Sequence, residues 1–208
     1  LDPKLVRFIP VAVGNRSRAF AVLVCVRHAH QRNVMNAGDL QRFERVVLPH
    51  LDDAYTLARY LLRDEHDAQD VVQEASLRAL RYFDGYSGGD ARAWLLAIVR
   101  NCSLTWRKKR RVDDRTIPFE DAAPLPTSDA EAPDAAAVQA SEQARVQQAI
   151  ASLPDEFREV IVLREVQDLS YREIGDVVGV PIGTVMSRLA RARKRLAVLL
   201  QLDAREAS

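Results

Sequence analysis

Apolar residues recur at steps of three and four positions along most of the chain from about residue 39 onward. That spacing is typical of helices that bury one face, and no segment shows a convincing two-residue period of a strand. The pattern predicts helices over residues 39–63, 67–83, 91–111, 141–153 and 155–167. We expect a bend at Pro49, because proline interrupts helical hydrogen bonding, and a helix cap at Asp90. The sequence therefore predicts an all-α protein.

Two shorter helices with a tight corner between them follow, within SYREIGDVVGVPIGTVMSRLARARKRL at residues 170–196. Ser170 and Glu173 form the S-x-x-E pattern of a capping box, which starts a helix. Gly179 suits the left-handed conformation that ends a helix, and Pro181 suits the first turn of the next one. Two short helices joined by a glycine-containing turn indicate a helix-turn-helix.

The second helix of this motif separates its apolar residues from its basic ones. At about 100° per residue, one face carries Val185, Leu189, Ala192 and Leu196. Hydroxyl and basic side chains occupy the other side: Thr184, Ser187, Arg188, Arg191, Lys194 and Arg195. A solvated charged helix usually mixes acids with bases, but this helix has no acid between Gly183 and Gln201. The one-sign stripe favours contact with DNA phosphates.

Composition changes abruptly in the middle of the chain. Between Val112 and Gln143 there are eight acidic residues against one basic residue, with four of the nine prolines. Such a segment is typical of an extended, mobile linker. The sequence thus predicts five segments. A poorly patterned extension (1–38) precedes a first helical domain (39–111). A flexible acidic linker (112–140) leads to a second helical domain (141–200) and a tail (201–208).

Bulk composition limits the classes of protein to consider. The 208 residues are 48% hydrophobic and 28% charged, which is normal for globular domains, and the net charge of +1 indicates no partner. Two cysteines make no disulfide framework, which fits a reducing compartment. The apolar run AFAVLVCV is shorter than a membrane span of about 20 residues. Polar His-rich sequence follows it instead of a signal-peptide cleavage site, so we expect a cytoplasmic protein without membrane insertion.

The extension holds a small group of metal-ligating side chains, Cys25, His28 and His30. Metal ligation is one interpretation, but the lack of any local pattern favours bystanders. Our hypothesis is that much of residues 1–34 is a loosely structured extension, and one interpretation is that it lies outside the natural start of translation. We expect no metal site and no cofactor.

Aromatic and basic side chains gather at the third helix and the loop before it. This helix ends in the run RKKRR at 107–111, and the loop is YSGG at 86–89. Aromatic residues lie nearby at Tyr82, Phe83, Tyr86 and Trp106. The basic run can serve solubility alone, but aromatic and basic residues beside a glycine loop suit unstacked bases and a single-strand backbone. Cys102 falls on the apolar face and is expected to be a core thiol.

The helix predicted at 67–83 carries a polar group on one side, consisting of Asp67, Asp70, Gln73 and Glu74. Paired carboxylates can serve acid–base catalysis or bind a metal. Neither histidine at ligand spacing nor a glycine motif that forms a pocket accompanies them, and His66 is isolated. A docking face for a basic protein partner fits this helix better, and we expect no enzymatic activity.

Three stretches together resemble the extracytoplasmic-function (ECF) sigma factors of the sigma-70 family, which are promoter-recognition subunits of bacterial RNA polymerase: DAQDVVQEASLRALRYFDGYSG, WLLAIVRNCSLTWRKKRR and LPDEFREVIVLREVQDLSYREIGDVVGVPIGTVMSRLARARKRL. The resemblance covers about residues 39–111, similar to sigma region 2, and 141–200, similar to region 4. It implies a factor that directs core polymerase to promoters through −35 and −10 elements and promotes DNA melting.

The resemblance also implies roles for particular residues. Contact with the β′ clamp helices of core polymerase falls to Asp67, Asp70, Gln73 and Glu74. Contact with the −10 element falls to Tyr86, Ser87, Asn101, Arg107 and Lys108. Contact with the −35 element falls to Arg164, Thr184, Ser187, Arg188, Arg191, Lys194 and Arg195. Met186 departs from the family pattern, because many members carry Lys or Arg there.

The implied partners are promoter DNA and core RNA polymerase, through its β′ clamp helices and β flap. Many members of the family are held by an anti-sigma factor, which is a further candidate partner. No small-molecule substrate is implied.

Three other functions compete with this interpretation. A stand-alone helix-turn-helix regulator would explain residues 155–196 but would leave the acidic and the aromatic-basic helices without a role. A nuclease would need a metal site of carboxylates or histidines. A protein that only binds and antagonises the transcription machinery would not need a basic recognition helix.

Overall fold

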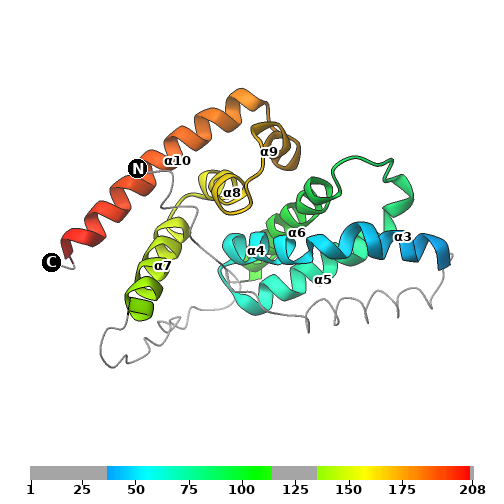
Figure 1. The fold of residues 1–208 in the computed structure, drawn as a ribbon, viewed down its shortest axis with the longest axis horizontal. Coiled ribbons are helices and arrows are strands. Elements are labelled where there is room, and N and C mark those ends of the chain that lie inside the picture. Colours follow the sequence, from blue (N-terminus) through cyan, green and yellow to red (C-terminus); the bar gives the residue numbers. More distant parts are fainter. Residues whose placement is uncertain (1–36, 114–134, 207–208) are drawn as a thin grey trace.

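The structure is a computed structural model that describes residues 37–113 and 135–206. The expected extension, apart from its last two residues, and most of the expected linker lie outside this range, as do Cys25, His28 and His30. Every element in the described ranges is helical, which confirms the predicted all-α class. The helices form two groups, α3–α6 and α7–α10 (Figure 1). None of the described helices combines the length and apolar character needed to cross a membrane.

The first group contains four α-helices and two short 3₁₀ turns. Its elements are α3 (Ala37–Val47), η1 (Leu48–His50), α4 (Leu51–Leu62), α5 (Glu65–Arg81), η2 (Phe83–Gly85) and α6 (Ala91–Asp113). The predicted bend at Pro49 is confirmed, because η1 separates α3 from α4 there. The predicted cap at Asp90 is also confirmed: its carboxylate accepts from the backbone N–H groups of Arg92 and Ala93 at 2.9 and 3.1 Å.

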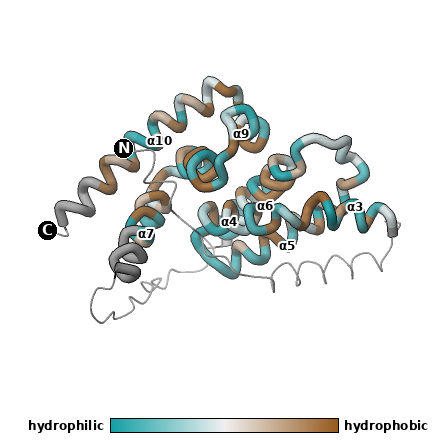
Figure 2. The backbone as a smooth tube through the Cα atoms, in the orientation of Figure 1, coloured by the Kyte–Doolittle hydropathy of each residue, from teal (hydrophilic) through white to brown (hydrophobic). Residues whose placement is uncertain are grey.

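Helices α4, α5 and α6 pack against one another around an apolar core. Phe43, Leu57, Leu95 and Leu96 are fully buried there. Figure 2 shows hydrophobic and hydrophilic residues alternating along α5 and α6, as expected for helices that bury one face. The apolar faces of these helices therefore form the core of the first domain.

The second group contains α7 (Ala135–Ala151), α8 (Asp155–Ile161), a π-helical turn η3 (Val162–Val166), α9 (Tyr171–Val178) and α10 (Ile182–Glu206). Two limits differ from the prediction. α7 starts six residues before the expected helix start at Ser141, because its alanine-rich beginning has high helix propensity. α10 continues through most of the expected tail, where leucine and alanine prolong the helical sequence.

The helix-turn-helix has the predicted local structure. The Ser170 side chain accepts from the Glu173 N–H, and the Glu173 carboxylate accepts from the Ser170 N–H at 2.6 Å. Hydrogen bonding of the Ser170 side chain and backbone N–H to the carboxylate lowers the pKa of Glu173. Gly179 ends α9 with φ of 74°, in the left-handed region. A side chain at Gly175 would meet the Val180 carbonyl oxygen at 3.0 Å, so a glycine lets the turn lie close to α9.

The two helical groups pack against each other. α8 contacts α4, α9 contacts α6, and the buried apolar residues of both groups form one continuous cluster. The Gln167 amide, which is 3% exposed, donates to the Asp53 carbonyl of α4 at 2.6 Å. The structure therefore holds the two domains in direct contact.

Replacement of Gly179 by Ala should lower the free energy of unfolding by about 1 kcal/mol, because a Cβ is disfavoured in the left-handed region. Open space surrounds this position, so strain in the backbone is the only expected cause. Urea denaturation of the full chain measures the change. Gly183→Ala is the matched control, since Gly183 is helical and equally open. The Gly183→Ala variant should keep or slightly raise the free energy of unfolding. Equal losses from both variants would contradict the left-handed strain assigned to position 179.

Candidate nucleic-acid and protein interfaces

The apolar stripe of α10 is buried and its opposite face is open. Val185, Leu189, Ala192 and Leu196 are each at most 2% exposed, as predicted. The exposed side of the helix includes Met186, Ser187, Ala190, Arg191 and Lys194. Arg191 and Lys194 are both exposed, and neither forms an ion pair with another side chain in the described ranges.

Other residues of the predicted −35 group are engaged within the second domain. The Arg188 guanidinium lies 3.2 Å from a Glu159 oxygen and 3.7 Å from a Glu156 oxygen, both on α8. Arg195 stacks on the Phe157 ring at 4.9 Å from its centroid. Both side chains lie beside the exposed face of α10 and point toward α8. Contact of Arg188 with DNA would therefore require it to leave its carboxylates.

Arg164 and Thr184 also have local surroundings that restrict them. Arg164 donates to the Leu169 carbonyl at 2.7 Å and lies over the Tyr171 ring. Thr184 is half-buried, and its carbonyl accepts from the Ser187 hydroxyl at 3.0 Å. The predicted −35 group therefore divides into an open part, with Ser187, Arg191 and Lys194, and a part that packs on its own domain.

An aromatic cluster lies under the loop before α6. Phe83 stacks on Tyr86 with ring centroids 5.7 Å apart, and Trp94 lies 5.1 Å from Tyr86. The Tyr86 hydroxyl donates to the Gly89 carbonyl at 2.7 Å, which fixes the loop against the ring. Tyr82 stands outside the cluster and is 63% exposed. The site thus offers one free aromatic face, at Tyr82, beside a ring group that is already packed.

Helix α6 carries two adjoining polar stripes. Asn101, Thr105 and Lys108 follow at helical spacing and are exposed, as is Ser87 in the preceding loop. Arg100 and Arg107 belong to the neighbouring stripe, which faces the second domain. Their side chains are only 16% and 23% exposed. The predicted −10 residues therefore lie on two faces, because Arg107 turns away from Asn101 and Lys108. Their contact with DNA stays a prediction.

The acidic helix α5 is partly neutralised by its own domain. Asp67 forms an ion pair with Arg110 of α6, and Glu74 lies 2.7 Å from Arg78 one turn later. Asp70 is exposed, whereas Gln73 is half-buried. Asp70 and Glu74 are therefore the most accessible members of the predicted core-polymerase group, whose role also stays a prediction.

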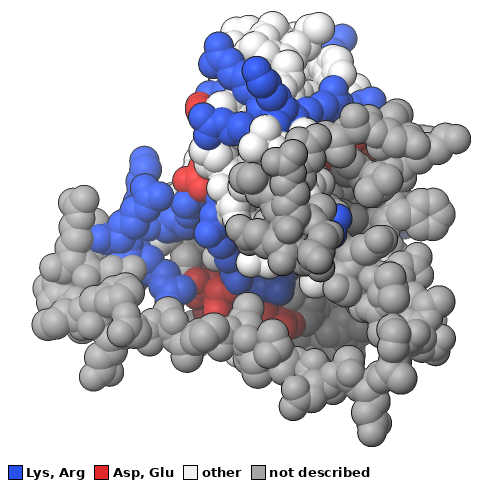
Figure 3. Space-filling view, turned by 90° about the vertical axis from the view of Figure 1, so that its left-hand side faces the viewer, with Lys and Arg blue, Asp and Glu red and all other residues white. Residues whose placement is uncertain are grey.

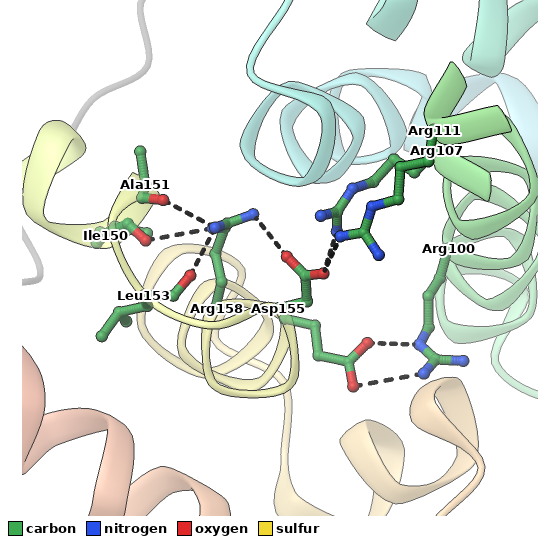
Figure 4. Close-up of polar contacts among 9 residues, drawn as sticks. Arg100, Arg107, Arg111, Ile150, Ala151, Leu153, Asp155 and Arg158 are labelled. Atoms are coloured by element: carbon green, nitrogen blue, oxygen red, sulfur yellow. Dashed lines mark hydrogen bonds and ion pairs between the residues drawn. The ribbon is translucent and has the colours of Figure 1, made fainter. Parts of the chain in front are cut away.

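The corner between α7 and α8 is built around Arg158, whose side chain is 1% exposed. Its guanidinium donates to three carbonyls at the end of α7 and the turn after it, those of Ile150, Ala151 and Leu153, at 3.3, 2.8 and 2.5 Å (Figure 4). The last carbonyls of a helix lack intrahelical partners, and that of Ile150 also accepts from the Leu153 N–H at 3.1 Å. Burial, reinforced by the charge of Arg63, lowers the pKa of Arg158 to about 10, so the group stays charged at neutral pH.

Asp155 connects this corner to the first domain. One of its oxygens accepts from Arg158 at 3.2 Å, and the other lies 2.7 Å from Arg107 and 3.7 Å from Arg111 of α6 (Figure 4). Partial burial opposes ionisation, but the hydrogen bond and charge of Arg107, with Arg158 and Arg111, outweigh it and lower the pKa of Asp155. The carboxylate is therefore charged throughout the physiological range.

Glu159, one turn after Asp155, is shared between the two domains. Its carboxylate, only 5% exposed, accepts from Arg100 of α6 at 2.8 Å and from Arg188 of α10 at 3.2 Å. Sequence reasoning gave no role to Asp155, Arg158 or Glu159. The run DEFREV offered a weak signal, since an arginine and a glutamate fall on the buried side of that helix, but their partners are distant in the sequence.

Surface charge is unevenly distributed. The face in Figure 3 shows two groups of lysine and arginine side chains, with acidic side chains beside the lower group. Exposed cations in the described chain come mainly from the end of α6 and from α10: Lys108, Lys109, Arg110, Arg111, Arg191, Arg193, Lys194 and Arg195. Opposite signs close together on one face suit a protein with both nucleic-acid and protein contacts.

Metal-binding chemistry has no support in the described ranges, where no group of three His, Cys, Asp or Glu residues is placed to hold an ion. Cys102 is 4% exposed, and burial raises the pKa of its thiol, which confirms a core position.

Family models match both domains. The model for sigma-70 region 2 matches residues 46–112, and the model for sigma-70 region 4 matches residues 143–196.

Relatives match over most of the chain. It is 34% identical to the RNA polymerase sigma-H factor of Pseudomonas aeruginosa, over 82% of this chain and 92% of that protein. It is 37% identical to the ECF RNA polymerase sigma factor SigE of Mycolicibacterium smegmatis, over 74% of this chain and 60% of that protein. With SigW of Bacillus subtilis the identity is 31%, over 76% of this chain and 89% of SigW.

Solved structures show the same fold. The sigma factor RpoE of Bartonella quintana, crystallised with the anti-sigma factor NepR, matches with a TM-score of 0.61 and 28% identity, over 78% of this chain and 99% of that chain. CnrH, in complex with the cytosolic domain of CnrY, matches with a TM-score of 0.56 and 26% identity, over 88% of this chain and 99% of that chain.

Replacement of Arg158 by Met should lower the free energy of unfolding by about 3 kcal/mol, because buried carbonyls and Asp155 would lose a charged donor. Urea denaturation followed by circular dichroism measures the loss. Arg193→Met is the matched control: Arg193 is half-exposed and pairs with Glu165 on the surface at 2.6 Å. Such pairs contribute less than about 1 kcal/mol. A loss at Arg158 no larger than the control's would contradict its role at the corner.

Proposed function

This chain belongs to the extracytoplasmic-function sigma factors of the sigma-70 family, and from that premise we propose that its two domains recognise the −35 and −10 elements of promoters for core RNA polymerase. We keep residues 39–111 as region 2 and residues 141–200 as region 4. The observation that carries the proposal is that each domain leaves one polar, partly basic helix face open, on α6 and on α10. The chain itself performs no covalent chemistry and acts in the cytoplasm.

The second domain reads the −35 element through α10. The open side chains of Ser187, Arg191 and Lys194 enter the major groove, while Thr184, Arg164 and Arg195 support the helix from its edges. Arg191 is long enough to reach base edges, and the exposed Lys194 provides charge for the backbone. Arg188 joins this group once it is released from Glu159 and Glu156.

The first domain binds the melted −10 element through α6 and the loop before it. Asn101, Lys108 and Ser87 line an open surface next to Tyr86 and the exposed ring of Tyr82. Stacking of an unpaired base on an aromatic side chain contributes about 1–3 kcal/mol, which is enough to favour capture of a base that has left the duplex. Arg107 supplies a further charge when it is not paired with Asp155.

Core polymerase makes two weak DNA readers effective together. We assign its β′ clamp helices to the acidic side of α5, with Asp70 and Glu74 most accessible, and Asp67 and Gln73 beside them. The β flap is assigned to the second domain. Tethering both readers to one polymerase raises their local concentration at a promoter. An anti-sigma factor is a further candidate partner, since two similar structures were solved with a bound protein partner.

Run-off transcription tests the function directly. Purified chain and sigma-free core polymerase are combined with a pool of genomic promoter fragments, and each component is omitted in turn. We expect discrete transcripts only when both proteins are present, because neither alone recognises and melts a promoter. DNA binding by the chain alone without polymerase-dependent transcripts would instead support a stand-alone regulator.

Replacement of Arg191 by Ala should reduce transcription from such a promoter about tenfold, since a base-edge contact discriminates by about 1–3 kcal/mol. Binding to core polymerase, measured by co-migration in gel filtration, should not change. Arg193→Ala is the control, because Arg193 is also on α10 but pairs with Glu165 away from the open face. Loss of core binding in R191A would refute the division of roles between the domains.

A further inference from the structure

The exposed side of α10 has an apolar edge beside its polar one. Ile182 and Met186, one helical turn apart, are 47% and 53% exposed, whereas few other large hydrophobic side chains of the described helices remain so open. The polar edge consists of Ser187, Arg191 and Lys194, all exposed. At about 100° per residue, the two edges run side by side along the start of the helix. We call Ile182 and Met186 the apolar edge.

The core of the second domain does not use the apolar edge. That core takes the buried stripe of α10, which begins at Val185 and includes Leu189. Further along the side of Met186, the charge of Arg193 is balanced by Glu165 at 2.6 Å. A single exposed apolar residue needs no explanation, but two at adjacent turns form a surface. The apolar edge therefore offers a ligand apolar contact rather than charge.

Gly183 lies between the apolar and the polar edge. A Cβ at this position would meet no atom within 4 Å, so packing within the described chain does not require a glycine there. Glycine inside a helix is less stable than alanine, and its usual benefit is close approach of the backbone to a ligand. The missing side chain leaves room for another molecule to approach α10 between Met186 and Ser187.

Duplex DNA presents one sizeable apolar group in its major groove, the C5-methyl group of thymine. The other groups at the base edges there are hydrogen-bond donors and acceptors, which a basic or hydroxyl side chain can contact. Methionine is flexible and polarisable, so it adapts well to a small apolar partner. An apolar edge beside Ser187 and Arg191 therefore matches a base-pair step in which a methyl group adjoins hydrogen-bonding groups.

We propose that the apolar edge selects thymine: Met186, supported by Ile182, contacts the C5-methyl group of a thymine in the −35 element and determines the base at that position. The proposal rests on the proposed function and adds to it the base that α10 prefers there. Because the thioether of Met186 donates no hydrogen bond, it gives no preference for the acceptor groups of guanine, which lysine or arginine would contact.

The test removes only methyl groups from the promoter. Purified chain and core polymerase transcribe a promoter identified by run-off transcription, in which each thymine of the −35 element, on either strand, is replaced in turn by deoxyuridine. Deoxyuridine keeps the hydrogen-bonding groups of thymine and lacks its methyl group. The wild-type chain is compared with Met186→Ala. Val198→Ala is the matched control, because Val198 is 50% exposed on the same helix, well beyond the apolar edge.

We expect deoxyuridine at one −35 thymine to reduce transcription by the wild-type chain about fourfold, as burial of one methyl-sized group predicts. Met186→Ala should transcribe the thymine promoter about fourfold less and lose its sensitivity to deoxyuridine at that position, because methyl and thioether act through one contact. Val198→Ala should keep the full sensitivity. Circular dichroism and co-migration with core polymerase confirm that both variants are folded.

A −35 element without thymine, or a wild-type chain that tolerates deoxyuridine throughout it, would overturn the proposal. Equal sensitivity of the wild-type chain and Met186→Ala would also overturn it: a lower rate on both templates would then indicate that the apolar edge contacts a protein. Failure of the proposed function looks different, since the wild-type chain would give no polymerase-dependent transcript from any template. That result would remove the sigma function and thymine selection together.

Discussion

The position of α8 depends on one buried guanidinium. Arg158 donates to three carbonyls at the end of α7 and in the turn after it, and it also holds Asp155 at the start of α8. A buried charge is tolerated only when such partners surround it. The direction of α8 follows from this corner, and α8 in turn carries the residues that contact both the first domain and α10. The position of α8 between the two described helical groups therefore follows from a satisfied buried charge.

The same helix explains why the two domains meet through charge rather than through apolar surface alone. Its apolar residues, such as Phe157 and Ile161, complete the core of the second domain. Its acidic residues project toward α6 and α10. Ion pairs of this kind combine modest net stability with strong dependence on geometry. An interface built in this way can be closed and still be exchangeable, which suits a protein whose ligands are polyanionic.

Local chemistry made much of the fold predictable. The capping box at Ser170, the corner at Gly179 and the buried stripe of α10 follow from residues within one or two helical turns of each other. The predicted helix start at Ser141 was wrong, because the helix propensity of the preceding alanines outweighs the acidic composition around them and α7 begins at Ala135. The site was predictable only in part: residue type and spacing indicate basic faces on α6 and α10, but not which arginines are already paired. Arg107 meets Asp155, and Arg100 meets Glu159, only after distant segments pack together.

Sharing of Glu159 between two arginines has an energetic consequence. Arg100 and Arg188 come from different domains, yet each compensates the same buried carboxylate. When one guanidinium leaves, the buried carboxylate keeps only the other as a cationic partner, and the remaining pair becomes more costly to break. The two arginines are therefore thermodynamically coupled, and the effects of replacing them are non-additive. Through one side chain, a change at α6 in the first domain alters the energetics of α10 in the second.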